Sequence, residues 1–75
     1  MELKDFIKIF ADQFDDTDAS EISAETKFRD LDEWSSLIGM GVIAMIKLEF
    51  GKSLSGSEMR QCQTVQDLYN LVTNK

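Results

Sequence analysis

The 75-residue sequence contains no histidine, no proline and only one cysteine. Without histidine, the chain lacks the side chain that serves most often as a general base and as a metal ligand. The single cysteine, Cys62, cannot form an intramolecular disulfide or a cysteine metal cluster, and it has no histidine with which to form a catalytic dyad. We therefore predict no catalytic and no metal-binding residues, and we expect Cys62 to be a small buried hydrophobe.

Long hydrophobic runs are also missing. The first ten residues, Met1 to Phe10, mix charged and apolar side chains, unlike a signal peptide, in which a charged start precedes an apolar run. The most apolar stretch of the chain is interrupted by Lys47, Glu49 and Lys52, so no segment reaches the length of a membrane span. These features predict a cytoplasmic protein without a membrane-spanning segment.

The chain is acidic, with 14 acidic and 8 basic residues and a net charge of −6. Nine of the acids and two of the bases fall within residues 12–33. An acidic segment of this kind repels phosphate backbones and favours basic partners, so we predict no nucleic-acid binding. Asp16, Asp18 and Ser20 have the spacing that begins a calcium loop. The sixth position of such a loop needs glycine but is Glu21 here, and the twelfth needs glutamate but is Lys27. The acids are therefore interpreted as a solvated segment.

Helical patterns occur in four places. In the first, apolar side chains recur at spacings of three and four and so share one helix face. These are Leu3, Phe6, Ile7, Phe10 and Phe14. The predicted helices are residues 2–14, 36–50, 57–62 and 65–72. The third is short, with Ser55 or Ser57 as its cap, and the pattern there is weak.

Capping residues mark the ends of the two best-defined helices. Ser35 or Ser36 is expected to cap the helix at 36–50, and Gly51 is expected to end it. Thr64 and Asp67 form a variant of the capping box at the start of the last helix. The predicted fold is therefore all-α.

The connection between the first two helices is long for a small domain. We expect its isolated apolar residues, Ile22, Phe28 and Leu31, to anchor it by packing onto the helices. The sequence thus predicts a small four-helix bundle, with three main helices, a short third helix and a long first loop. At this length residues 1–75 are expected to form a single domain.

The segment from Ser36 to Phe50 is apolar or glycine at nearly every position. Spacings of three and four assign Val42, Ile43, Ile46 and Phe50 to the core face. The remaining large apolar residues are predicted to face solvent and bind partner proteins, because an exposed apolar patch on a small domain usually marks an interaction surface. They are Leu37, Ile38, Met40, Met45 and Leu48. A dimer could cover the same patch, but we expect a monomer.

One long stretch resembles the acyl carrier protein family. It reads T-K-F-R-D-L-D-E-W-S-S-L, from Thr26 to Leu37, and opens an apolar helix that ends L-E-F-G. Members of the family typically show a Phe, a short acidic stretch with a Leu, and then Asp-Ser-Leu at the start of the second helix. Downstream, Lys52-Ser53-Leu54 and Thr64-Val65 are similar to the family's loop and to the start of its last helix. The resemblance covers essentially the whole chain.

The resemblance implies that Ser36 is esterified by 4′-phosphopantetheine, a covalent cofactor that makes the chain a phosphoprotein. The terminal thiol of that arm would hold an acyl group as a thioester for fatty-acid, polyketide or related biosynthesis within lipid metabolism. The chain would then be a carrier and not an enzyme. Its partners would be a phosphopantetheinyl transferase and acyl-loading, condensing and acyltransferase enzymes. Ser35 is a rival acceptor, and Ser36 is preferred because the family's serine directly precedes Leu, as Ser36 precedes Leu37.

Two departures from the family pattern suggest a specialised member. Ser35 stands where the family usually has the Asp that helps to position the serine for modification. The second helix, usually rich in acids, has only the opposite charges Lys47 and Glu49, so we expect its docking to be more apolar and less sensitive to salt. Acids stand instead just before the serine, at Asp30, Asp32 and Glu33. An unmodified helical interaction module and a D-alanyl or other aminoacyl carrier remain alternatives.

Overall fold

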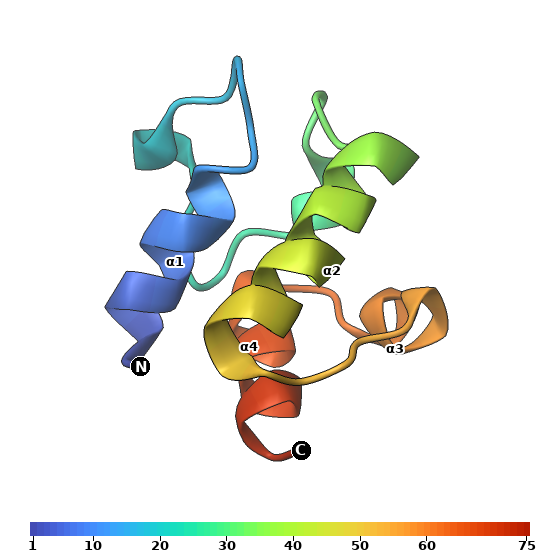
Figure 1. Ribbon diagram of the computed structural model, residues 1–75. Helices are drawn as coiled ribbons and strands as arrows, with labels where there is room; N and C mark the ends of the chain where they lie inside the picture. The colour runs from blue at the N-terminus through green and yellow to red at the C-terminus, as the bar shows by residue number, and fades with distance from the viewer.

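The computed structural model describes residues 1–75 as a small helical domain with no strands. Its helices are α1 (Leu3–Ala11), α2 (Ser36–Phe50), α3 (Gly56–Gln61) and α4 (Val65–Thr73). Two short 3-10 turns, η1 (Ala19–Glu21) and η2 (Phe28–Asp30), lie in the long loop between α1 and α2. Figure 1 shows α1 beside α2, with α3 on the other side of α2 and α4 toward the bottom of the view. The predicted four-helix architecture with a long first loop is confirmed.

Local capping explains where α2 and α4 begin and end. The Thr64 hydroxyl accepts the backbone N–H of Asp67, and the Asp67 carboxylate accepts the N–H of Thr64, both at 3.1 Å. Gly51 ends α2 in the left-handed conformation, with φ at 66°, which glycine adopts without a steric penalty. Both helices begin at the predicted residues, and α4 continues one residue further than predicted, to Thr73.

The other two helices differ slightly from the prediction. The first ends at Ala11, three residues before Phe14, because the N–H groups of Gln13 and Phe14 bond the carbonyls three residues back and tighten the last turn. The third begins at Gly56, where Ser55 is the cap and Glu58 completes a capping box. Ser55, and not Ser57, is therefore the cap of α3.

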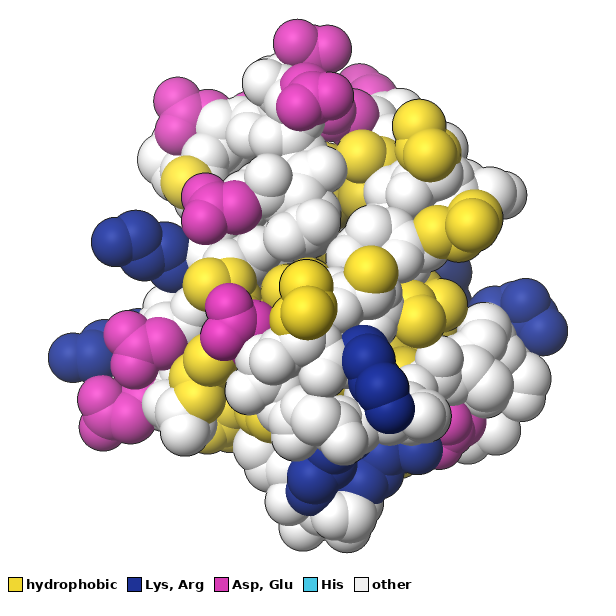
Figure 2. All heavy atoms as spheres, viewed as in Figure 1, with side chains coloured by type: hydrophobic (Ala, Val, Ile, Leu, Met, Phe, Trp, Pro, Cys, Tyr) yellow, Lys and Arg dark blue, Asp and Glu magenta, His cyan; other side chains and the backbone are white.

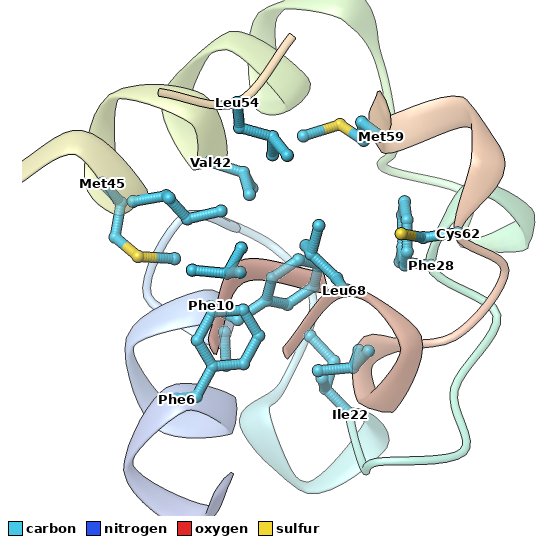
Figure 3. Close-up of a cluster of buried hydrophobic side chains, with 14 of the residues drawn as sticks. Phe6, Phe10, Ile22, Phe28, Val42, Met45, Leu54, Met59, Cys62 and Leu68 are labelled. Carbon is cyan, nitrogen blue, oxygen red and sulfur yellow. The ribbon is translucent and has the colours of Figure 1, made fainter. Parts of the chain in front are cut away.

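One hydrophobic cluster of 15 buried residues forms the core. Figure 3 shows how it is assembled, with Phe6 and Phe10 of α1 close to side chains from α2 and α4. The long loop contributes Ile22 and Phe28, which are buried, and Leu31, which is half-buried against the cluster. The predicted anchoring role of these three loop residues is therefore confirmed.

Cys62 is also buried in this cluster, as predicted. Burial raises the pKa of the Cys62 thiol above its ordinary value, and the nearby Asp67 carboxylate acts in the same direction. A buried thiol with a raised pKa is a weak nucleophile, which agrees with a packing role.

The inner face of α2 is wider than the sequence spacing indicates. Val42 and Ile46 are fully buried, as predicted, whereas Ile43 and Phe50 are only half-buried at the edge of the core. Met45 is 6% exposed, so the prediction that it faces solvent is wrong. It lies on the side of α2 that α1 covers, and in Figure 3 its side chain points toward the phenylalanines of α1.

Candidate functional site

Two adjacent serines stand at the start of α2, and they have different roles. Ser35 is the N-cap, with an extended backbone, and its Oγ accepts the backbone N–H of Ile38 at 3.3 Å. Ser36 is the first residue of the helix and is exposed. Its hydroxyl makes no hydrogen bond within the chain and is therefore free for a visiting enzyme.

The position of Ser36 suits a negatively charged substituent. The N–H groups of the first helical turn have no partner inside a helix, and they form the positive end of the helix dipole. Ser35 satisfies only the N–H of Ile38, which leaves those of Ser36 and Leu37 without a partner in the chain. A phosphodiester on the Ser36 Oγ would lie next to these groups, where an anion is stabilised.

Aromatic packing holds the segment that leads into α2. The Trp34 ring lies 5.0 Å from the ring of Phe28 and 6.3 Å from that of Phe14, measured between centroids. A Cβ atom on Gly39 would be 3.4 Å from Trp34, so the glycine lets the indole pack closely against the helix. Gly39 therefore serves the close packing of the indole against α2.

Glu33 fixes the other side of this segment to the start of the loop that follows α1. Its carboxylate accepts the backbone N–H groups of Asp15, Asp16 and Thr17 at 2.7, 3.0 and 2.8 Å, and the Thr17 hydroxyl at 2.7 Å. Partial burial of Glu33 acts to raise its pKa, but these four hydrogen bonds outweigh it and lower the pKa below its ordinary value.

These four hydrogen bonds to the Glu33 carboxylate, called the Glu33 clamp below, distinguish Glu33 from the other two acids that precede the serine. Asp30 and Asp32 are exposed and free to meet a partner, whereas the Glu33 carboxylate is used within the chain. The role of Glu33 is a functional feature that sequence reasoning missed. No local spacing reports it, because its partners stand 16 to 18 residues away.

A groove of about 480 Å³ lies directly beside Ser36, between the first half of α2 and α3. Trp34, Met40, Ile43 and Met59 form its apolar wall, and the side chains of Arg29 and Arg60 also line it. No carboxylate lines the groove.

The outer face of α2 carries part of the predicted partner-binding patch. Leu37, Met40 and Leu48 are 77%, 66% and 85% exposed. Ile38 is half-buried, and Met45 belongs to the core. Figure 2 shows yellow side chains over the region of α2, with several acidic side chains at the top of the view and several basic side chains toward the bottom. Three of the five predicted residues therefore share one exposed apolar face.

No three side chains among Cys, Asp and Glu are grouped so that they could hold a metal ion. None of the helices combines the length and the apolar character that crossing a membrane requires.

A family model described as the phosphopantetheine attachment site matches residues 4–72. Neither a curated protein nor a solved structure matches the chain. The matched residues run from the first turn of α1 into the last turn of α4. Members of this family carry 4′-phosphopantetheine covalently on a serine, and other enzymes modify and use them. The chain therefore belongs to the phosphopantetheine attachment site family and is a carrier domain of the acyl carrier protein type, not a catalyst.

Proposed function

We propose that Ser36 is the serine that carries the phosphopantetheine arm, and that the arm presents an acyl thioester to enzymes of fatty-acid, polyketide or related biosynthesis. One observation carries the choice of serine. The Ser36 hydroxyl is exposed and free at the start of α2, whereas the Ser35 hydroxyl is engaged as the helix cap. Modification of Ser35 would remove that cap from the helix.

The chain's own contribution is to present the serine and to receive partners. The groove beside Ser36 is lined by no carboxylate, and the phosphopantetheinyl transferase supplies the base that removes the hydroxyl proton. When attached, the arm supplies a thiol that holds the acyl group as a thioester. Tethering keeps that group at high effective concentration for each docked enzyme, which is what a carrier contributes to a pathway.

Partner enzymes are proposed to dock on the outer face of α2, at Leu37, Met40 and Leu48. These exposed apolar side chains extend along the helix that begins with Ser36. The only charges on α2 are Lys47 and Glu49, which cancel, so apolar burial should dominate binding. The partners would include the transferase and the loading, condensing and acyltransferase enzymes.

We further propose that residues 1–75 act as one cytoplasmic, monomeric domain. The single cluster of buried residues, drawn from all four helices and the long loop, supports one domain. Ser35 in place of the family's usual Asp keeps the unmodified interaction module as the second candidate. An aminoacyl cargo, such as D-alanine, is the alternative within the carrier class.

The test is the intact mass of the protein after incubation with coenzyme A and a broad-specificity phosphopantetheinyl transferase. The native chain and Ser35→Asp should each gain one phosphopantetheinyl group, because aspartate also caps a helix and restores the family's residue. Ser36→Ala should gain none. No gain in any chain, including protein isolated from its native source, would favour the interaction module, and a gain lost only in Ser35→Ala would move the site to Ser35.

A further inference from the structure

The exposed apolar side chains of α2 form a ridge with a hollow on each side. The members of this ridge recur at spacings of three and four, so they share one face of the helix. They are Leu37, Met40, Ala44 and Leu48, all of them exposed. Ala44 lines both hollows and therefore lies between them.

The two hollows differ in charge. One has a volume of about 530 Å³ and lies between α2 and the loop before α3, and Lys47 is the only charged residue that lines it. The other has a volume of about 330 Å³ and lies between α2 and Gln13, just after α1, and Glu49 is the only charged residue that lines it. The ridge thus has a cation on one flank and an anion on the other.

Neither of these charges is used within the chain. The ion pairs of the chain are Lys4–Glu2 and Lys75–Glu58, so Lys47 and Glu49 take part in none, and both are exposed. Ion pairs at an exposed rim add little net affinity. Their larger effect is to fix the register and orientation of a bound partner.

A helix fits the shape of this surface. Helices pack by placing the ridge of side chains on one into the grooves beside a ridge on the other. At 1.5 Å per residue the ridge from Leu37 to Leu48 is roughly 16 Å long, which matches about three turns of a partner helix. Leucine stands at each end of the ridge, so apolar contact alone does not decide whether that helix runs along α2 or against it.

We infer that partner enzymes dock on this ridge through a helix with an acidic residue on one flank, facing Lys47, and a basic residue on the other, facing Glu49, and that these two contacts fix the direction of that helix along α2. The inference rests on the proposed docking of partners on the outer face of α2. Direction matters because Ser36 stands at one end of α2 only. An enzyme docked the other way round would hold its active site away from that serine.

The probe is a synthetic amphipathic helix of about four turns, with leucines on one face, glutamates along one flank and an equal number of lysines along the other. A nitroxide spin label is attached to one end of this peptide. The label broadens the amide NMR signals near it, so it reports whether that end lies by Leu37 or by Gly51. With the native chain, broadening at one of these ends should exceed that at the other about threefold, the size expected for two exposed ion pairs.

Two double variants keep the net charge of −6 and leave the apolar ridge untouched. In Lys47→Glu/Glu49→Lys the charges are exchanged, so the broadening should move to the opposite end of α2. In Lys47→Gln/Glu49→Gln both charges are gone, so the two ends should be broadened equally while the peptide still binds. An unchanged signal of the buried Val42 amide before peptide is added shows that each variant has kept its fold.

Three results would overturn the inference. They are equal broadening of both ends in the native chain, broadening of the same end after the charges are exchanged, and no shift of any α2 amide on addition of the peptide. None of them depends on the phosphopantetheine arm, because the unmodified chain is used. A chain that gains the arm at Ser36 but shows no preferred direction would retain the proposed carrier function and refute the inference alone.

Discussion

The carboxylate of Glu33 accepts both the backbone N–H and the side-chain hydroxyl of Thr17, at 2.8 and 2.7 Å. Together with the bonds from the N–H groups of Asp15 and Asp16, these bonds tie the start of the loop after α1 to the segment that leads into α2. Ser36 follows Glu33 by three residues. The placement of the proposed attachment serine is thus coupled to a contact on the opposite side of the long loop.

Loss of the Glu33 clamp should loosen the loop and slow modification. In Glu33→Ala the N–H groups of Asp15, Asp16 and Thr17 lose their acceptor, so their hydrogen exchange should be at least tenfold faster, as expected for amides left without a protein partner. The KM of the phosphopantetheinyl transferase should rise because Ser36 is held less firmly. Asp32→Asn, which removes a charge but no hydrogen bond at an exposed neighbour, is the matched control and should change neither quantity.

We expect the protein to lose stability in acid, because protonation of Glu33 weakens the same clamp. The folded-state pKa of Glu33 is lower than its ordinary value of 4.5, so its carboxylate stabilises the fold fully above about pH 4.5. That contribution is lost as the pH falls through the folded-state pKa. Thermal unfolding measured from pH 7 to pH 3 should show the midpoint falling below pH 4.5, and Glu33→Gln should reduce the fall. An identical pH profile in Glu33→Gln would contradict a stabilising role for the ionised carboxylate.

The two serines should have separable effects on stability. Ser35→Ala removes the acceptor for the Ile38 N–H and should lower the free energy of unfolding by about 1 kcal/mol. Ser36→Ala removes no hydrogen bond and should change it by less than about 0.5 kcal/mol. Urea denaturation of the unmodified proteins measures both. The reverse order would mean that Ser36 caps the helix and that Ser35 has the free hydroxyl.

Met45 and Met40 should differ sharply despite lying on the same helix. Met45→Ala leaves a cavity in the core and should cost about 2–4 kcal/mol of unfolding free energy. Met40→Ala should cost less than about 0.5 kcal/mol, because its side chain is 66% exposed. Denaturant melts of the two variants provide the comparison, and equal losses would show that α2 is rotated relative to the orientation described above.

The outer face of α2 should bind partners with little dependence on salt. Leu37→Ala and Leu48→Ala are expected to raise the KM of the transferase or of a loading enzyme three- to tenfold, the loss typical of a useful apolar contact. Raising the salt concentration from 50 to 500 mM should change the KM of the native chain by less than about threefold, since apolar burial is not screened. Steep loss of binding in salt would instead point to the exposed acids Asp30 and Asp32.

Local sequence determined the helices and the kind of domain. A capping box is a contact between residues three apart, and a glycine with positive φ ends a helix by its own conformation, so Thr64, Asp67 and Gly51 mark helix ends without reference to the rest of the chain. The stretch from Thr26 to Leu37 was specific enough to indicate the carrier family, which the family match over residues 4–72 confirms.

Only the tertiary structure decided which side chains of α2 are buried, and Met45 is the example. Spacing along a helix of nearly uniform hydrophobicity shows where faces lie relative to one another, but the neighbouring helix determines which of them is covered. The hydrogen bonds that Glu33 accepts from Thr17, and the one that Arg29 donates to the backbone carbonyl of Arg60, are likewise contacts between distant residues. Such contacts depend on how the chain folds back on itself, and no local pattern in the sequence records that.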